Sequence, residues 1–387
     1  MMLDFFLYIF SGVLVGIGAA FVPGLFYSEI SLLFFGFITD IPAAIFIASS
    51  AISFSLFEFI STNIFGIGDD ITSLSLGMQQ ENLEKIAKTV SFGAIISMFL
   101  SIPLVFVFQI LFVQISPIMK DSLLVILVAI IIYTVVSEKT FFRKISATLI
   151  FVATGIFGTL IQNSGFLPSN LLLMPVFIGL YGFSSIIARK HSEKTMVNPL
   201  SLAEKIKISL ISFGTSLLSI FIPSMKRSQT SAIAFGLGKF EQTESVVLSL
   251  SILSTSFLFI SIIALSSNSI RSTLAYDISD IVSGLNYNQI LMILGSLVIA
   301  AVVSIFLLLN SVKFLNKTVS RINKKYLKMF GFACGIVLIS YFTSWKGILL
   351  AFVATCIGIL SIKLRVKSVH LMGVLLVPTL VRLLASI

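Results

Sequence analysis

Charged side chains are scarce in this chain. Asp, Glu, Lys and Arg together make up 11% of its 387 residues, whereas a soluble domain carries about 25%. Hydrophobic residues reach 57% and the mean hydropathy is +1.10. This composition excludes an ordinary soluble fold and predicts a protein that crosses a membrane many times.

Cysteine is also rare, since the chain has only Cys334 and Cys356. Both lie in apolar stretches, so neither a disulfide nor a metal site is expected. The sequence has no Ser-His-Asp set, no phosphate-binding glycine loop and no zinc-ligand spacing, and its short loops leave no room for an ATPase domain. We therefore expect no enzyme and no cofactor. Any pumping energy must come from an ion gradient, with Na⁺ or H⁺ as the coupling ion, or from a partner.

Basic residues are absent from the first 84 positions, because Lys85 is the first Lys or Arg. Without a basic segment at its start, the chain is expected to have no cleavable signal peptide. The net charge is nevertheless +10, which could suggest nucleic-acid binding. The basic residues lie in short loops between apolar spans, however, which is the positive-inside pattern of membrane proteins. We therefore expect no nucleic-acid partner.

The chain matches itself at an offset of 200 residues. FVPGLFYSEISLLFFG (21–36) and FIPSMKRSQTSAIAFG (221–236) share six of sixteen residues, and the match continues from IASSAISFSLFEFI (47–60) to VLSLSILSTSFLFI (247–260). Both copies place a proline inside an apolar segment. In a membrane chain, two such interrupted segments in corresponding halves indicate a transporter whose substrate site lies between the halves.

The apolar segments form two sets of similar order. Each set begins with two short arms around a proline, as in a re-entrant hairpin, and continues with spans near the ~20 residues that cross a bilayer. In the first set the arms are 5–22 and 25–38 and the spans are 42–65, 90–113, 118–137, 145–162 and 169–188. In the second set the arms are 207–222 and 228–239 and the spans are 243–267, 288–310, 329–344, 347–362 and 370–385.

The basic loops predict opposite topologies for the two sets. In the first half, EKTFFRK (138–144) and RKHSEK (189–194) follow the third and fifth spans after the hairpin. In the second half, the stretch from Lys313 to Lys328 and KLRVK (363–367) follow the second and fourth. Since basic loops stay in the cytoplasm, this change of phase predicts an inverted repeat. The same counting places the loop 66–89 in the cytoplasm.

The two hairpins are the candidate substrate site. Proline removes a backbone donor and breaks a helix, and broken backbone at membrane depth persists only where it is buried in protein or lines a polar cavity. The freed backbone groups can then bind substrate, and a helix that starts after the break directs its positive end at an anion. The candidate substrate-binding residues are Pro23, Gly24 and Ser28 in one hairpin and Pro223, Ser224, Arg227, Ser228 and Gln229 in the other. An alternative is that Lys226 and Arg227 mark a loop at the membrane surface.

Two acids are candidates for ion coupling. Glu29 follows the first break, at the position equivalent to Gln229, and Glu58 lies in an otherwise apolar span opposite Leu258. A carboxylate inside a membrane is costly and indicates function by default, although a hydrogen bond to a neighbouring Ser or Thr would also explain it. His370 opens the last span, and we expect it at the membrane interface.

One enzyme motif has to be weighed against transport. GIGDD (66–70) contains the Gly-x-Gly-Asp pattern of intramembrane aspartyl proteases, for which Asp40 would be the second acid. The pattern has three fixed residues in a glycine-rich loop, no Pro-Ala-Leu-like segment follows it, and it does not account for the repeat. A protease is therefore a remote alternative.

Four segments give the chain a family resemblance: GVLVGIGAAFVPGLF (12–26), DDITSLSLGMQQENLEKIAKTVSFGAIIS (69–97), LLLMPVFIGLYGFSSII (171–187) and VKSVHLMGVLLVPTL (366–380). Together they resemble the large permease subunit of the tripartite tricarboxylate transporters, in its archaeal-type branch. The resemblance covers nearly the whole chain. It implies an ion-driven, multi-pass permease for carboxylates, with a small membrane subunit and an extracytoplasmic binding protein as partners.

The sequence departs from that family at the hairpins. A small or polar residue and an Asn commonly follow Pro-Gly-Leu in the family, but Phe26, Tyr27, Ser28 and Glu29 stand here. The substrate and the coupling ion therefore do not carry over. The Lys-Arg pair after Pro223 suits phosphate, so a translocase for a polyprenyl-phosphate lipid carrier is an alternative to a permease for a small organic anion.

These observations predict an all-α polytopic membrane protein made of two inverted-topology repeats. Each repeat has a proline-broken hairpin and about five transmembrane helices. The first covers 1–195 with its hairpin at about 5–38, and the second covers 196–387 with its hairpin at about 207–239. The protein is expected in the cell membrane, in contact with its lipids, as a secondary transporter of a small anion. A homodimer is a further expectation.

Overall fold

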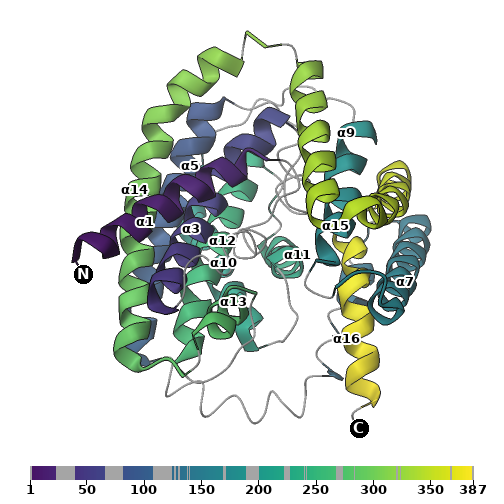
Figure 1. The fold of residues 1–387 in the computed structure, drawn as a ribbon, viewed down its shortest axis with the longest axis horizontal. Helices are drawn as coiled ribbons and strands as arrows, with labels where there is room; N and C mark the ends of the chain where they lie inside the picture. Colours follow the sequence, from purple (N-terminus) through teal and green to yellow (C-terminus); the bar gives the residue numbers. More distant parts are fainter. Residues whose placement is uncertain are drawn as a thin grey trace.

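A computed structural model shows a chain that is helical throughout the part it describes, without a strand there (Figure 1). Six helices in this part are long and apolar enough to cross a membrane: Asp40–Phe65, Leu83–Val107, Phe141–Ser164, Glu244–Leu265, Tyr287–Val319 and Met329–Lys363. The predicted all-α polytopic membrane protein is thus confirmed. The described residues are 2–22, 40–65, 82–107, 124–125, 128–129, 131–136, 138, 140–168, 171–188, 200–221, 227–238, 240, 242–266, 273–282, 284–319, 321–322, 324–366 and 368–385.

The helices follow the order that the apolar segments predict. The first half contains α1 (Met2–Ala20), α3 (Asp40–Phe65), α5 (Leu83–Ser101), α7 (Phe141–Ser164) and a segment made of α8 (Leu173–Phe177), the π-helix η1 (Ile178–Phe183) and α9 (Ser184–Ala188). The second half contains α10 (Leu202–Phe221), α11 (Arg227–Gly238), α12 (Thr243–Leu265), α13 (Thr273–Ile281), α14 (Tyr287–Val319), α15 (Lys324–Lys363), the 3₁₀ turn η2 (Ser368–Met372) and α16 (Gly373–Ala385).

Two predicted loops are partly helical. α5 begins at Leu83 rather than at 90, because the Asn82 side chain caps it by accepting a hydrogen bond from the Glu84 N–H at 3.0 Å. α14 continues past 310 to Val319, so Lys313 and Lys317 lie on a helix and not in the basic loop. Long basic side chains are good helix formers, so a change from apolar to basic residues marks the membrane boundary without ending the helix.

α15 consists of two arms. Ser344 has φ 55° and ψ −158°, which breaks the helical geometry between them. A positive φ is uncommon for a residue other than glycine. The arms, Lys324–Thr343 and Trp345–Lys363, correspond to the two spans predicted at 329–344 and 347–362. The sequence gap between these spans therefore coincides with a real bend.

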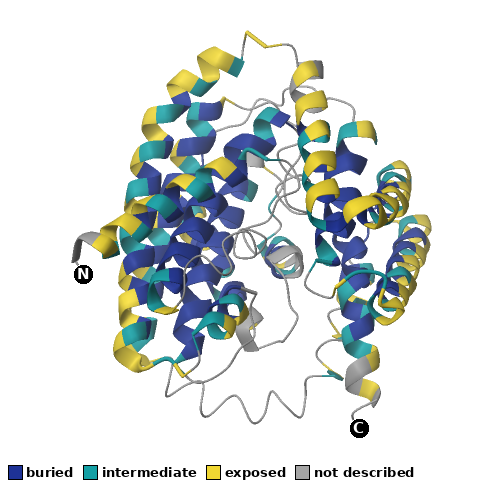
Figure 2. Cartoon of the chain, viewed as in Figure 1, coloured by how far each residue is buried: buried dark blue, intermediate teal, exposed yellow. Residues whose placement is uncertain are grey.

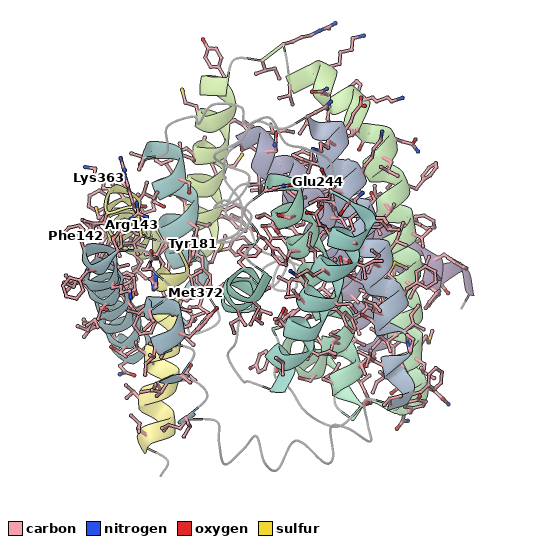
Figure 3. The ribbon with its side chains drawn as sticks, turned by 180° about the vertical axis from the view of Figure 1, so that it is seen from behind. Phe142, Arg143, Tyr181, Glu244, Lys363 and Met372 are labelled. Atoms are coloured by element: carbon pink, nitrogen blue, oxygen red, sulfur yellow. The ribbon has the colours of Figure 1, made fainter. Side chains whose placement is uncertain are left out.

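The helices gather into two hydrophobic clusters. The larger one is built mainly on α1, α3, α5, α10 and α12–α14, and the smaller one on α7, α8, the second arm of α15, η2 and α16. α3 and α12 are buried along nearly their whole length, as the dark helices inside the larger cluster show in Figure 2. α11, which follows the second proline, lies between the two clusters in Figures 1 and 3.

Equivalent helices of the two halves make equivalent contacts within each half. α1 packs along α3, and α10 packs along α12. Gly12 lies against Ser49, and 200 residues later the Ser212 and Ser249 hydroxyls are 2.7 Å apart. About one helical turn further, Gly16 lies against Ser53 in the first half. In the second half, the Ser256 hydroxyl donates to the Ser216 hydroxyl at 2.8 Å. Both pairs of helices therefore run parallel, and the first of these contacts has the same register in both halves.

The remaining helices exchange partners between the halves. α5 packs on α12, and its counterpart α14 packs on α3; α7 packs on α16, and the second arm of α15 packs on η1. A Cβ at Gly158 would overlap the Val374 carbonyl oxygen, and one at Gly358, 200 residues later, would overlap that of Leu180. Small residues of this kind let membrane helices approach closely. The two halves are thus interlocked rather than packed as separate bodies.

α5 and α12 run parallel even though they come from different halves. Lys85 Nζ lies 3.1 Å from a Glu244 carboxylate oxygen, Ser251 donates to the Val90 carbonyl at 2.7 Å, and Ser97 donates to the Ile252 carbonyl at 3.1 Å. If α3 and α5 cross in opposite directions, as consecutive spans do, α12 opposes its counterpart α3. This packing favours the inverted topology, which remains a prediction.

The second half opens with a capping box. The Ser201 N–H and hydroxyl both donate to Glu204 Oε2 at 2.8 Å, and Glu204 is the third residue of α10. This arrangement satisfies a donor that the first helical turn leaves open. The hydrogen bond from the Ser201 N–H, with that from its hydroxyl, holds the pKa of the exposed Glu204 carboxyl below its usual range.

Candidate functional site

The hairpin residues that the sequence nominates are only partly described. Pro23, Gly24, Ser28, Glu29, Pro223 and Ser224 lie outside the described residues. Arg227, Ser228 and Gln229 form the first turn of α11, as predicted for a helix that starts just after the break, but their side chains are outside the description. Their role in binding therefore remains a prediction, and the site is built here from the elements around it.

The first break begins beside the part of α3 that carries Glu58. α1 ends at Ala20, and the turn that follows places the Phe21 ring 6.4 Å from the Phe57 ring and 6.5 Å from the Phe65 ring, between centroids. These edge-to-face contacts fix the chain two residues before Pro23. The last described residues before Pro23 and the predicted coupling residue Glu58 thus lie in one region of the larger cluster.

Glu58 is buried in the middle of this region. Its side chain belongs to α3, the residue is 3% exposed, and Leu258 occupies the equivalent position on α12 with no exposure. In the second half, an apolar leucine therefore fills the place that Glu58 occupies in the first half. Since a buried carboxylate is expensive, its presence in only one half favours a functional role over a structural one.

The second break is flanked in a similar way. α10 ends at Phe221 and α11 begins at Arg227, and both helices pack on α12. Thr230 and Ser231, in the first turns of α11, are buried, at 1% and 2% exposure. The described helices that flank the two predicted breaks therefore pack on the two central helices, α3 and α12, which are equivalent in the repeat.

Hydroxyl groups line these central helices, and several of them, including those of Ser50, Ser53 and Ser261, bond a carbonyl of their own helix. Three on α12 hold neighbouring helices together. Ser249 and Ser256 bond to α10, while Ser251 bonds to α5. Such contacts between membrane helices are worth about 0.6–2 kcal/mol each. Ser49 has no hydrogen-bond partner, because Gly12 stands where Ser212 meets Ser249 in the other half. The absence of that one hydroxyl explains the unbonded Ser49 oxygen.

Sequence reasoning missed a buried pair in the smaller cluster. His370 Nε2 lies 3.1 Å from Glu138 Oε1, and the two side chains are 1% and 2% exposed. Both side chains are buried within the protein, and Glu138 belongs to the stretch just before α7, while the place of His370 at the membrane interface remains a prediction. The two residues are 232 positions apart in the chain, so no local pattern could reveal the pairing. The only available signal was an ionisable residue beside an apolar run.

The geometry argues against the aspartyl-protease alternative. Asp40 is the exposed first residue of α3, and the Gly-x-Gly-Asp motif follows the last residue, Phe65. A helix of 26 residues is about 39 Å long. Four residues of chain beyond Phe65 reach back at most about 14 Å. The carboxylates of Asp40 and Asp69 therefore cannot both reach the same peptide bond of a protease substrate.

Comparison with known proteins gives a consistent assignment. The model of the tripartite tricarboxylate transporter TctA family matches residues 6–373. An uncharacterized protein from Methanocaldococcus jannaschii is 24% identical over 404 residues, which cover 97% of this chain and 98% of that protein. No solved structure matches. The family resemblance inferred from the four sequence segments is confirmed, and the chain belongs to the tripartite tricarboxylate transporter TctA family.

Proposed function

We propose that this protein is a secondary permease that moves a small organic anion, of the di- or tricarboxylate class, by ion-coupled alternating access. The family supports transport of this substrate class. The observation that carries the mechanism is the exchange of partners between the halves, in which α5 packs on α12 and α14 on α3. Transporters with inverted repeats bind substrate and ions at the interface between the repeats, and this exchange supports such an interface here.

In this proposal the substrate lies between the two hairpins. Backbone groups freed at Pro23-Gly24 and Pro223-Ser224, with the Ser28 and Ser228 hydroxyls and Gln229, coordinate the anion. Arg227 pairs with a carboxylate, and the positive end of α11 supports it. A planar guanidinium can hold a carboxylate with two parallel hydrogen bonds. Glu29 or Glu58 holds the coupling Na⁺ or H⁺, so that substrate and ion sites lie close together.

The family name also bears on partners. Tripartite systems combine a permease with a substrate-binding protein and a small membrane subunit, so membership favours both as partners of this chain. Exposed apolar side chains cover one face of α7, including Phe142, Leu149 and Leu160. This face suits lipid or a small membrane subunit.

Carboxylate binding is expected to raise the thermal stability of the detergent-purified protein. A ligand that binds only the folded state adds RT ln(1 + [L]/Kd), or about 2.7 kcal/mol at a hundredfold excess over Kd. We expect citrate to raise Tm, and to raise it further with Na⁺ or at acid pH. Short polyprenyl phosphates should not raise it.

The hairpin site is tested in the same assay with Arg227→Ala and Ser28→Ala. Both variants should weaken the citrate shift, whereas Ser209→Ala should not, because the Ser209 hydroxyl bonds the Lys205 carbonyl of its own helix. If both hairpin variants respond to citrate like the wild type, the hairpin site is wrong. A shift with polyprenyl phosphate alone would instead support the lipid-carrier translocase.

A further inference from the structure

His370 and Glu138 form an ionisable pair inside an apolar cluster. His370 lies in the 3₁₀ turn η2, between buried Val369 and Leu371, and its Nε2 meets the Glu138 carboxylate at 3.1 Å. The other ring nitrogen, Nδ1, is buried without a hydrogen-bond partner. Buried polar atoms without a partner are rare in native proteins, so this half-satisfied ring requires an explanation.

Packing does not require a histidine at this position. Gly373 of the second half lies against the Phe151 carbonyl oxygen, and Gly179 of the first half lies against the carbonyl oxygen of Ala351, 200 residues further along than Phe151. In this register Val176 stands opposite His370, and Val176 is fully buried. A valine therefore fills the equivalent place. Replacing a buried ion pair by apolar residues is often neutral or stabilising, so the pair of His370 with Glu138 is not explained by stability.

The pair is connected to the second hairpin. The Thr154 hydroxyl donates to the His370 carbonyl oxygen at 3.3 Å, which ties η2 to the middle of α7. On its other side η2 contacts α11, the helix that starts at Arg227. Met372, the last residue of η2, lies on the side of the smaller cluster that faces α11 (Figure 3). A change in charge at His370 would therefore act next to the arm of the second hairpin.

The charged groups around the pair come from several elements. Among the residues that the structure describes, Glu138 is the ionisable group within ion-pair distance of His370. The basic residues nearby on neighbouring elements are partly or fully exposed: Arg143 and Lys144 open α7, while Lys363 and Arg365 close α15. The side chains of Arg227 on α11 and Arg382 on α16 are not described, and Lys139 and Lys367 lie outside the described residues.

We infer that His370 and Glu138 form a second ion site of the transport cycle, one that takes up and releases a proton. When the ring is neutral, one of its nitrogens carries a hydrogen. When a proton binds, both do, and the imidazolium forms an ion pair with the Glu138 carboxylate. Histidine is the side chain whose ordinary charge change falls between about pH 5 and pH 8. This inference rests on the proposed permease function, because it assigns a proton to that cycle.

Proton binding can be observed without any substrate. The chain has two histidines, His191 and His370, so His191→Gln leaves one ring to follow. With histidine-labelled protein in lipid nanodiscs, lowering the pH should convert the ring resonances of His370 from those of the neutral ring to those of the protonated ring. In Glu138→Gln the protonated ring should be less populated at the same pH, because the carboxylate that favours the cation is gone. Ring resonances that stay constant while the pH is lowered from about 8 to about 5 would overturn the inference.

Coupling is tested by citrate uptake into proteoliposomes with an acid exterior and no sodium gradient. His370→Asn and Glu138→Gln should each reduce net uptake roughly tenfold or more, which corresponds to about 1.4 kcal/mol of lost coupling. Exchange of external for internal citrate at equal pH should persist, since it needs no net proton movement. Glu244→Gln is the matched control, because Glu244 is also a buried acid in an ion pair, with Lys85.

The outcomes separate the two claims. Variants that keep the wild-type response to the pH gradient would overturn the proton site, even if the ring titrates. Loss of exchange together with uptake would indicate that the pair only holds the fold, and would also count against it. If the wild type takes up no citrate, the proposed substrate class fails. The nanodisc titration then decides by itself whether the pair binds a proton.

Discussion

Gly16→Ala is expected to lower the thermal stability of the purified protein, while Gly18→Ala, two residues along the same helix, leaves it unchanged or raises it. A Cβ at Gly16 would overlap the Ser53 hydroxyl and the Ser50 carbonyl oxygen of α3. The carbonyl belongs to a fully buried helix and cannot move aside, so α1 must shift. Overpacking of this kind costs about 1–3 kcal/mol.

Gly18 provides the matched control. A Cβ there would meet nothing within 4 Å, and the residue is exposed on α1. Alanine in place of an exposed helical glycine stabilises a helix by about 0.5–1 kcal/mol. Unfolding monitored in one detergent should therefore move in opposite directions, or at least differ clearly, for the two variants. Equal melting temperatures would contradict the close packing of α1 on α3.

Lys85→Met is expected to destabilise the protein more than Glu244→Gln, although both remove the same ion pair. The Lys85 side chain is 36% exposed and that of Glu244 is 9% exposed, with 3.1 Å between nitrogen and oxygen. Without Lys85, a carboxylate stays buried and unpaired, whereas without Glu244 the ammonium can still reach water. A buried group left unsatisfied costs about 1–3 kcal/mol.

This asymmetry matters because the pair joins the halves. Lys85 is on α5 of the first half and Glu244 opens α12 of the second, and Glu244 lies in the larger cluster in Figure 3. Melting curves of the two variants and of the double variant Lys85→Met/Glu244→Gln measure the effect directly. The double variant should be more stable than Lys85→Met alone. If Glu244→Gln is the more damaging single change, the burial assigned to the two side chains is wrong.

Much of the fold could be predicted from apolar length and from the internal match. α3 was expected at 42–65 and runs from Asp40 to Phe65, and the gap between two expected spans coincides with the bend at Ser344. The nine-residue helix α13 was not anticipated, because it is shorter than a span. Its Leu274 and Ile278 are nevertheless buried, and it packs against α3 and α12. Amphipathic turns of this length are hard to separate from loops by pattern alone.

The segments that form the candidate site could be predicted from the sequence, but the contacts between residues far apart in the chain could not. The start of α11 at Arg227 and the buried position of Glu58 are where the sequence placed them. The contact of Phe21 with Phe57, which sets the end of α1 beside the part of α3 that carries Glu58, depends on tertiary packing. The pair of His370 with Glu138 depends on it as well, and a sequence gives no range at which to search for such a partner. Pro23, Gly24, Ser28, Glu29, Pro223 and Ser224 lie outside the described residues, so their roles remain predictions.

The most direct test of ion-coupled carboxylate transport is uptake of labelled citrate by proteoliposomes that contain only this protein. We predict that an inward gradient of Na⁺ or of H⁺ drives citrate to an internal concentration above the external one, and that an ionophore collapsing the gradient releases it. Citrate that enters no faster than into protein-free liposomes, under either gradient, would contradict the account.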